Sequence, residues 1–333
     1  MTGNTGTAAC VDPSGHGTHV AGIIAARGNN SVGVTGVCWN VQIASLRVFD
    51  SNGNVTTDRF VQALDHAEYY DIPILNYSGW FGTQIDMAAG EAIETYPGLL
   101  ICAAGNDGQN INSTVHTPAT FLCQNIIVVG NSTAANQRHS SSNYGNANVD
   151  LFAPGENILS CFPVSQCTAG KCSGANKGTH IANGYHKMTG TSMAAPYVTG
   201  VAALLLSKNP NINLCEIKST IMDTVTQSAA FANICVSGGR LNAYQALSNI
   251  QNHTTIFGIE DSYQHSGYCR NDSCAFEGEF YFECHHIDYE EYSGEEHWRR
   301  CVDNCGYEDL APHNWSYSEI YCVDCFYVVE NED

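Results

Sequence analysis

Short apolar runs alternate with longer amphipathic stretches along residues 20–250. The apolar runs are rich in Val, Ile and Leu, as strands buried on both faces of a sheet should be, and they lie at residues 41–49, 72–77, 99–104, 126–130 and 149–152. Between them, residues 57–70 and 84–96 place apolar side chains on one face of a helix. This alternation predicts βαβ units, and therefore an α/β fold: a three-layer α/β/α sandwich with a mostly parallel sheet.

Two further segments depart from the amphipathic pattern. Residues 193–207 are apolar almost all the way round, which predicts a central buried helix. Near Asn249 the composition changes, because residues 251–333 hold seven cysteines and six histidines with little periodicity. We therefore expect a domain of ordinary enzyme size at residues 1–250 and a separate extension at residues 251–333.

The net charge of −20 is concentrated in that extension, where 3 basic and 19 acidic side chains give −16, against −4 for residues 1–250. An acidic chain lacks the positive surface that binds nucleic acid, and anionic membranes repel it. No apolar run approaches the ~18–20 residues that a membrane span needs. We expect a monomer with neither a nucleic-acid partner nor a membrane span.

Sixteen cysteines in 333 residues indicate an oxidising compartment. Glycosylation sequons agree with secretion, although such triplets are common by chance, and examples begin at Asn29, Asn112, Asn131 and Asn314. Residues 1–10 have neither the basic start nor the apolar stretch of a secretory signal. We therefore expect an extracellular protein whose sequence here lacks its beginning.

Residues 190–196 read Gly-Thr-Ser-Met-Ala-Ala-Pro and place Ser192 where the buried helix begins. Acyl transfer needs a nucleophile at a sharp turn beside a base, and a helix start offers free N–H groups to a developing oxyanion. Pro196 is expected in the first turn or so, where its missing N–H costs little. Taken alone, Ser192 is more simply an N-cap.

Residues 15–22 read Gly-His-Gly-Thr-His-Val-Ala-Gly and open a second apolar helix, with His16 at its exposed end. Its small residues would let this helix lie close to a neighbour. Two histidines on one helix could bind zinc, but the Glu that zinc proteases place beside the first His is replaced by Gly17. A zinc protease is therefore disfavoured.

These two stretches resemble the histidine and serine signatures of the subtilase family, and residues 103–106 (Ala-Ala-Gly-Asn) resemble its oxyanion-asparagine motif. The order His, Asn, Ser agrees, with spacings of 90 and 86 residues, and the resemblance covers about residues 12–248. It implies a serine endopeptidase in which Ser192 is the nucleophile and His16 the general base and then acid. Asn106 would donate to the oxyanion together with the N–H of Ser192.

The resemblance also implies two extended edges that pair with the substrate backbone. By position they match Gly53, Asn54 and Val55 on one side and Ser78, Gly79 and Trp80 on the other, although the first could be a plain turn. Residues Ala103, Ala104 and Gly105 would form one wall of the pocket for the residue before the scissile bond. His116 is expected near the floor of that pocket, and the cleavage specificity stays open.

Residues 28–34 (Gly-Asn-Asn-Ser-Val-Gly-Val) resemble the calcium loop of the family, in which Asn30 would be the side-chain ligand. The family completes this site with groups that precede the histidine, and a polar surface loop is the alternative. No catalytic cofactor is expected.

The aspartate of the triad lies, in the family, on a first core strand well before the histidine. Fifteen residues precede His16, and their one acidic residue, Asp12, matches a structural position instead. We therefore expect an N-terminally truncated fragment of a working endopeptidase, with activity reduced by the missing carboxylate. The alternative is an inactive relative retained as a binding or adhesion module, which the joint presence of His16, Asn106 and Ser192 disfavours.

The cysteines suggest several roles. Cys102 lies in a predicted core strand and should be a small buried hydrophobe, whereas three cysteines ahead of the serine should staple a loop: Cys161, Cys167 and Cys172. In the extension, two pairs have spacings that suit zinc, namely Cys301 with Cys305 and Cys322 with Cys325. Disulfides are favoured there in a secreted protein, and one of its seven cysteines could pair with the body, for example with Cys235.

Overall fold

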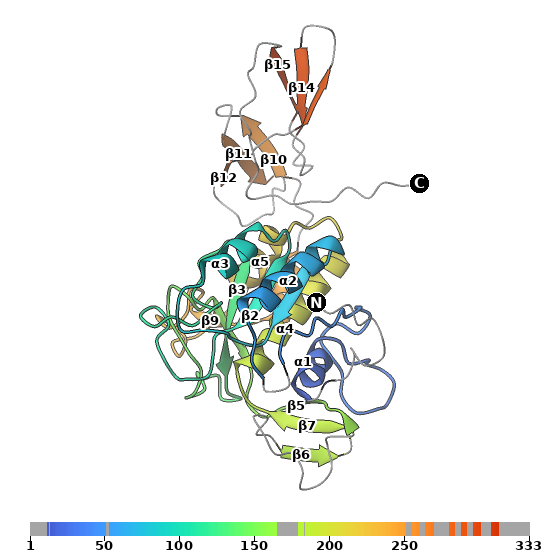
Figure 1. Ribbon diagram of the computed structural model, residues 1–333, viewed down its shortest axis with the longest axis vertical. Coiled ribbons are helices and arrows are strands. Elements are labelled where there is room, and N and C mark those ends of the chain that lie inside the picture. The colour runs from blue at the N-terminus through green and yellow to red at the C-terminus, as the bar shows by residue number, and fades with distance from the viewer. Residues whose placement is uncertain are drawn as a thin grey trace. The chain divides into compact units, whose positions relative to one another are not determined.

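The computed structural model describes residues 12, 14–50, 53–164, 179–182 and 184–250, and the backbone of six strands within residues 251–333 (Figure 1). The chain divides into two compact units, Met1–Ile250 and Gln251–Asp333. Each unit is described by itself.

A six-stranded sheet forms the centre of the first unit, in the order β1-β2-β3-β4-β9-β8. The strands are β1 (Ile74–Tyr77), β2 (Leu99–Ala103), β3 (Ile126–Ser132), β4 (Leu151–Pro154), β8 (Thr226–Gln227) and β9 (Gly239–Arg240). All neighbours are parallel except β8 and β9. Every residue of β2 and β3 is buried, as a sheet covered on both faces requires.

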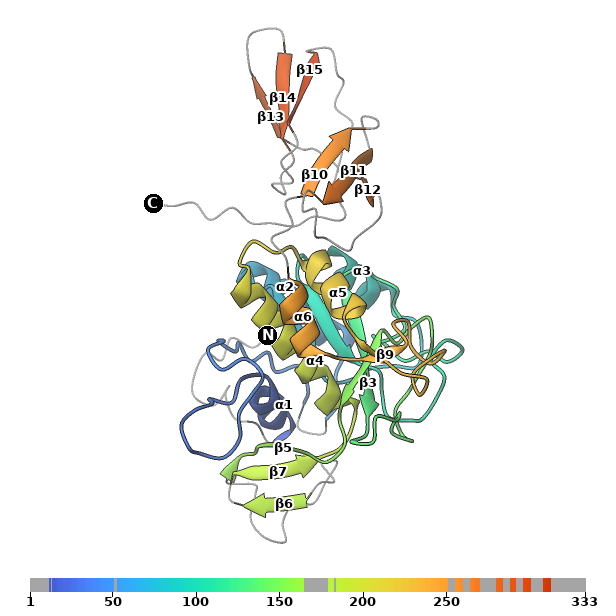
Figure 2. The ribbon, with the colours of Figure 1, turned by 180° about the vertical axis from the view of Figure 1, so that it is seen from behind.

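Helices cover both faces of this sheet (Figures 1 and 2). Leu100 and Cys102 of β2 pack with α2 (Thr57–Tyr69) and α3 (Met87–Thr95). Leu99 and Ile101 point the other way, toward α4 (Thr191–Lys208), α5 (Leu214–Asp223) and α6 (Ala243–Asn249). This alternation follows from the two-residue period of a strand. The predicted three-layer α/β/α fold is thereby confirmed.

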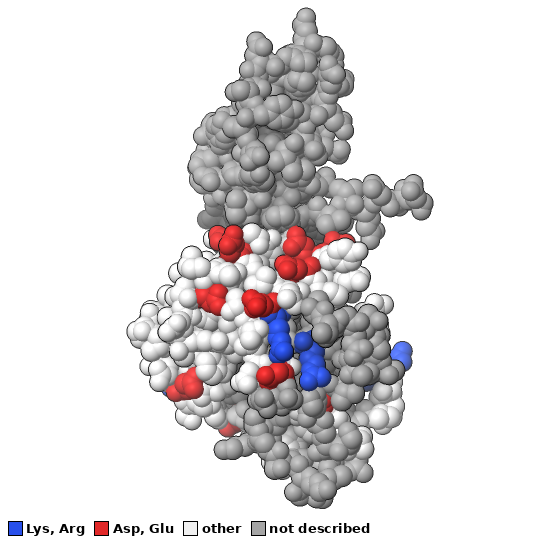
Figure 3. Space-filling model, in the orientation of Figure 1, with Lys and Arg blue, Asp and Glu red and all other residues white. Residues whose placement is uncertain are grey.

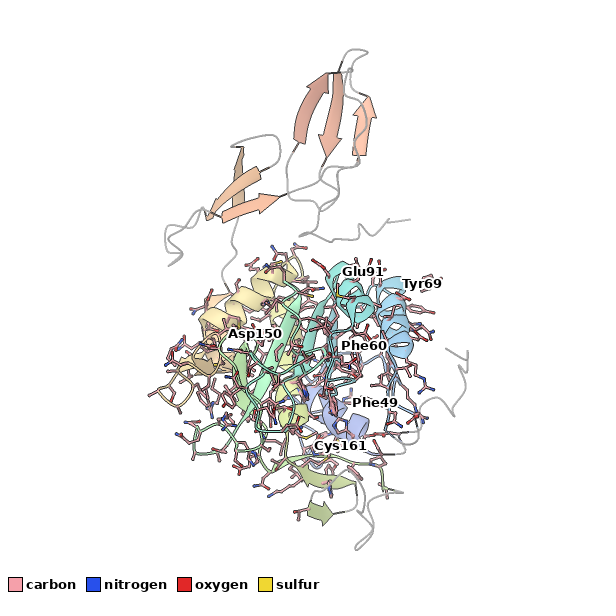
Figure 4. All side chains as sticks on the ribbon, turned by 60° about the vertical axis from the view of Figure 1, so that its left-hand side comes forward. Phe49, Phe60, Tyr69, Glu91, Asp150 and Cys161 are labelled. Carbon is pink, nitrogen blue, oxygen red and sulfur yellow. The ribbon has the colours of Figure 1, made fainter. Side chains whose placement is uncertain are left out.

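Aromatic side chains fill the space between the sheet and the α2 layer. Tyr77 of β1 stacks on Phe49 at 6.0 Å between ring centroids and meets Phe60 of α2 edge-on at 5.0 Å (Figure 4). Phe60 is 3% exposed, so its burial alone contributes roughly 1.5–3 kcal/mol. These contacts fix α2 over β1. On the face of this unit seen in Figure 3, Asp and Glu side chains are spread over the surface, with a few Lys and Arg side chains among them.

Helix α1 (His16–Ala25) packs on α4 and on a small antiparallel sheet in the order β5-β7-β6. That sheet consists of β5 (Ile158–Cys161), β6 (Thr179–Ala182) and β7 (Tyr185–Met188). The fully buried ring of His19 ties the helix down, because its Nε2 lies 3.1 Å from the carbonyl of Ile158 and 3.0 Å from that of His186. The hydroxyl of Ser160 also donates to the His19 carbonyl at 2.7 Å.

The strand predicted at residues 41–49 is wrong, since this segment forms no strand. Val48 is buried in the core, but Ile43 is 44% exposed. Among the described residues, β1 pairs with β2 alone, and no strand lies against its other edge. Among the described residues this segment makes none of the backbone hydrogen bonds to a strand that would place it in a sheet, although its apolar side chains pack in the core.

Burial decides between several roles suggested by the sequence. Cys102 is fully buried in β2, which confirms its role as a core residue. None of the five other described cysteines forms a disulfide with a described residue; these are Cys38, Cys123, Cys161, Cys215 and Cys235. Asn131 is fully buried in β3, so its sequon cannot carry a glycan. Cys167 and Cys172 lie outside the described residues.

The second unit contains two three-stranded antiparallel sheets. One comprises β10 (Thr255–Ile259), β11 (Gln264–Cys269) and β12 (Phe280–Glu283), and the other β13 (Asp288–Glu291), β14 (Glu296–Arg300) and β15 (Glu308–Pro312). The paired cysteines Cys301, Cys305, Cys322 and Cys325, and the sequon at Asn314, lie outside the described residues. In the described part of the chain, no helix has the length and apolar character of a membrane span.

Candidate active site

Ser192 and Ser78 hold each other through two reciprocal hydrogen bonds. The Ser78 hydroxyl donates to the Ser192 carbonyl at 2.9 Å, and the Ser192 hydroxyl donates to the Ser78 carbonyl at 3.3 Å. Ser192 is half-buried in the first turn of α4, where backbone N–H groups are left without intrahelical partners. The structure thus places the serine of the motif at a helix start, directly beside residues 78–80.

Pro196 explains why the Ser192 carbonyl is available. In a regular helix this carbonyl would accept from the N–H of residue 196, which proline lacks. Pro196 lies inside α4, in its second turn and not in the first turn as the sequence suggested. The Ser78 hydroxyl replaces the lost donor, so the proline and the serine contact form one arrangement that ties α4 to the end of β1.

Asn106 follows the end of β2 and is oriented by the residue before Ser192. Its Oδ1 accepts from the backbone N–H of Thr191 at 2.9 Å and from the Thr191 hydroxyl at 3.2 Å. The same hydroxyl accepts from the Gly105 N–H at 3.1 Å. Because Oδ1 is held in this way, the Nδ2 amide of the exposed Asn106 side chain remains available to an outside acceptor.

His16 begins α1, and Asp12 caps that helix. The Asp12 carboxylate accepts from the backbone N–H groups of Gly15 at 2.9 Å and Thr18 at 2.7 Å. Burial acts to raise the pKa of Asp12, but these hydrogen bonds, led by those from Thr18, leave the pKa below its usual value. Burial lowers the pKa of the half-buried His16 ring, against the attraction of Asp12, so His16 is neutral at pH 7.

No hydrogen bond joins His16 to Ser192 among the described residues. The two helices that carry them do pack together, since Val20 and Ile23 of α1 share a cluster with Met193 of α4. The resting Ser192 hydroxyl is turned to the Ser78 carbonyl instead. The hydroxyl proton of Ser192 is therefore directed at the Ser78 carbonyl and not at His16.

The edge at residues 53–55 begins as a turn. The Gly53 N–H donates to the Asp50 carbonyl at 3.2 Å. The Asn54 carbonyl accepts from the Asp50 N–H, and the Asn54 N–H donates to the Asp50 carboxylate, both at 2.9 Å. The sequence left a turn and a substrate edge as alternatives, and this geometry is compatible with both. In an extended segment alternate residues face the same neighbour, so the groups on either side of Asn54 could still pair with a peptide.

Residues 78–80 and 103–105 lie on either side of His116. The His116 ring stacks on the half-exposed Trp80 at 5.2 Å between centroids and 24° between planes. A Cβ added to Gly105, whose φ is +100°, would lie 2.2 Å from Nε2 of His116. Burial lowers the pKa of His116, although Asp107, 3.7 Å from Nδ1, acts to raise it. Ala103 and Ala104 are themselves buried.

The candidate calcium loop has a regular backbone. Asn29, Ser31 and Gly33 have positive φ of 55°, 58° and 60°, so every second residue is left-handed. Oδ1 of the exposed Asn30 accepts from the N–H of Val32 at 3.0 Å. Across the part of the chain that is described, no three His, Cys, Asp or Glu side chains gather into a metal site.

Two residues that organise this site were missed by sequence reasoning. Thr191 fixes the Asn106 side chain, and Asn143 binds the main chain on both sides of it. Thr191 lies within the serine motif, but the motif does not show that this residue orients Asn106, and Asn143 carries no signal beyond that of an ordinary polar residue. Both act on partners far away in the chain, which a local pattern does not reveal.

Comparisons with known proteins agree with this geometry. A profile of the subtilase family matches residues 4–251. A thermophilic serine proteinase from Bacillus sp. (strain AK1) is 34% identical over 72% of this chain and 53% of its own length. Subtilisin DY from Bacillus licheniformis is 32% identical over 65% of this chain and 72% of its own length.

A solved protease structure from Pseudoalteromonas arctica PAMC 21717 has a TM-score of 0.57 and 30% identity, covering 70% of each chain. The chain thus spans only about half the length of the first of these relatives, 53%, and more of the others. The matched region contains the histidine, asparagine and serine motifs and the whole six-stranded sheet. This chain belongs to the subtilase family.

Proposed function

We propose that this chain is a serine endopeptidase that cleaves peptide bonds through an acyl-enzyme on Ser192. Ser192 Oγ would attack the scissile carbonyl carbon while its proton passes to the neutral His16 ring. His16 would then give this proton to the leaving amine as the carbon–nitrogen bond breaks, and water would release the acyl group by the reverse roles. The Asn106 Nδ2 and the Ser192 N–H would stabilise the oxyanion.

One observation carries the proposal: Thr191 holds Asn106 immediately beside the first turn of α4, where Ser192 lies. Two donors, the Asn106 side-chain amide and the N–H of Ser192 at the helix start, would therefore be available to an oxyanion formed at Ser192. Loss of one such donor costs ~10²–10³ in kcat, a magnitude that comes from subtilisin itself, a member of this family. A serine that merely capped a helix would have no need of the asparagine.

A fluorophosphonate probe tests the proposal directly. The chain should be labelled on one serine, the label should disappear in Ser192→Ala, and Asn106→Ala should slow it without unfolding the protein. Casein cleavage that is lost in the same variants would establish the endopeptidase. A folded chain that neither labels nor cleaves would instead support the binding or adhesion module.

The substrate is proposed to be an extended peptide held between residues 53–55 and residues 78–80. The Ser78 carbonyl already contacts the Ser192 hydroxyl, so a peptide paired with this segment would pass directly over the nucleophile. Residues 103–105 and His116 would then border the side chain before the cleaved bond.

A structural calcium ion fits residues 28–34. Positive φ at Asn29, Ser31 and Gly33 gives the loop a tight, alternating backbone, in which main-chain carbonyls and the Asn30 side-chain oxygen would be the ligands. Such oxygen groups suit Ca²⁺, which would rigidify the loop that follows α1. Chelation should lower the melting temperature, and Asn30→Ala should abolish this difference.

Extracellular action fits the 16 cysteines and the acidic extension. We propose disulfides rather than zinc in residues 251–333, and a monomeric enzyme. Metal analysis and thiol counting of the purified chain test the first point, and light scattering the second.

A further inference from the structure

Asn143 is fully buried beneath the surface segment that carries Asn106. It contacts four main-chain groups on the two sides of Asn106. Its Nδ2 donates to the Ala104 carbonyl at 2.9 Å, and its own N–H donates to the Gly105 carbonyl at 2.9 Å. Its Oδ1 accepts from the N–H groups of Asp107 at 3.1 Å and Gln109 at 2.9 Å.

These contacts bracket Asn106 in the chain. Among the described residues, Asn106 itself is held by its side-chain Oδ1 alone, which accepts from Thr191, and it lies at the surface. The direction of its Cα–Cβ bond is therefore set by the path of residues 104–109. Asn143 fixes that path with two separate groups on one side chain, an NH2 donor and a carbonyl acceptor.

The fit leaves little freedom. A Cβ on Gly105 would lie 2.4 Å from Nδ2 of Asn143, so the main chain already touches this amide. Asn143 is anchored in turn, because the Ser142 hydroxyl donates to its carbonyl at 2.9 Å. Arg138 donates to the Ser142 carbonyl at 2.6 Å and lies over the Tyr144 ring, 4.7 Å from its centroid.

We propose that Asn143 is a positioning residue for the oxyanion donor: it sets the main chain around Asn106 so that Nδ2 of Asn106 points at the developing negative charge. This role rests on the proposed function. A donor that contributes mainly in the transition state is sensitive to its direction, whereas substrate binding along residues 53–55 and 78–80 does not involve it. Asn143 also holds Ala104 and Gly105, which border the pocket, so KM is compared on a substrate with glycine before the cleaved bond, which places no side chain against this wall. With that substrate Asn143 should affect the chemical step and not KM.

Asn143→Leu removes both the donor and the acceptor, and Asn125→Leu is a matched control. Asn125 also donates from Nδ2 to three carbonyls, those of Ile93, Tyr96 and Gly98. These carbonyls precede the start of β2, whereas the site follows its end. Both changes should lower stability. Asn143→Leu should slow phosphonylation of Ser192 and lower kcat by about 10²-fold with KM unchanged, whereas folded Asn125→Leu should keep both.

A double-variant cycle shows whether Asn143 acts through Asn106. If it does, Asn106→Ala with Asn143→Leu should be no slower than Asn106→Ala alone. Effects that multiply, or a loss that appears in KM, would overturn the proposal.

Hydrogen exchange tests the same geometry without relying on activity. In Asn143→Leu the N–H groups of Asp107 and Gln109 should exchange at least about tenfold faster, while in Asn125→Leu they should not change. Asn143→Asp keeps the acceptor oxygen, so the N–H groups of Asp107 and Gln109 should remain protected from exchange. This variant replaces Asn143→Leu in the test if the leucine variant does not fold. Unchanged exchange of these N–H groups in Asn143→Leu would refute the proposed positioning role of Asn143. A parent chain that fails to label would refute only the proposed function.

Discussion

Acidification should destabilise the first unit through His19. The ring is fully buried, and its Nε2 faces two carbonyls while its Nδ1 has no hydrogen-bond partner among the described residues. A second proton would have to sit on Nδ1, where nothing accepts it. Burial accordingly lowers the pKa of His19 from 6.5 to about 4, despite the two carbonyls that favour the charged form.

The magnitude follows from the two pKa values. Below pH 6.5 the unfolded chain protonates His19 while the folded chain does not, so the free energy of unfolding falls as the pH falls, until about pH 4. A difference of roughly 2.5 pKa units corresponds to about 3 kcal/mol, with a slope of at most about 1.4 kcal/mol per pH unit. This is a large part of the stability of an ordinary domain.

Urea unfolding between pH 4 and 7.5 measures this loss, and His19→Gln isolates it. The glutamine amide can still donate to a carbonyl but does not titrate, so the variant should be less stable at pH 7 and show a shallower pH dependence. The nearby His16 and His186 remain in both proteins. Equal slopes for the parent and the variant would refute the assignment to His19.

Two further changes test the packing around the nucleophile. Ser78→Ala should lower the free energy of unfolding by about 1–2 kcal/mol, because it removes the donor to the Ser192 carbonyl. Adding Pro196→Ala should recover part of this loss by supplying a helical N–H to the same carbonyl, and no recovery would contradict the explanation. Gly105→Ala should cost more than about 2 kcal/mol, because its Cβ would lie 2.2 Å from a ring atom, whereas Gly53→Ala meets nothing within 4 Å and should cost about 1 kcal/mol of strain. Equal losses in thermal melts would count against the steric argument.

The local pattern of the sequence predicted most of the fold. Residues 99–103 and 126–129 are apolar at every position, and such runs between amphipathic helices leave few alternatives to a buried parallel strand. The prediction failed at residues 41–49, whose composition is equally suited to a strand. What that segment lacks is backbone pairing with a strand, which depends on the arrangement of the whole sheet and not on local composition.

The site shows the same division. His16, Asn106 and Ser192 stand in long motifs, so their proposed roles came from the sequence, although the structure does not show a hydrogen bond between His16 and Ser192. Asn143 lies in a Ser-Ser-Asn-Tyr stretch that resembles any turn. Its partners are 34 to 39 residues away, and only the folded chain brings them together.

The unpaired edge of β1 has a consequence for the solubility of the protein at high concentration. Among the described residues this strand pairs on one side alone, and the neighbouring segment exposes Ile43 with a single charged residue, Arg47, along residues 41–49. An open strand edge beside an apolar, β-prone segment is a template for another chain. At high concentration the chain is expected to join edge to edge, and one added lysine in this segment should keep it dispersed.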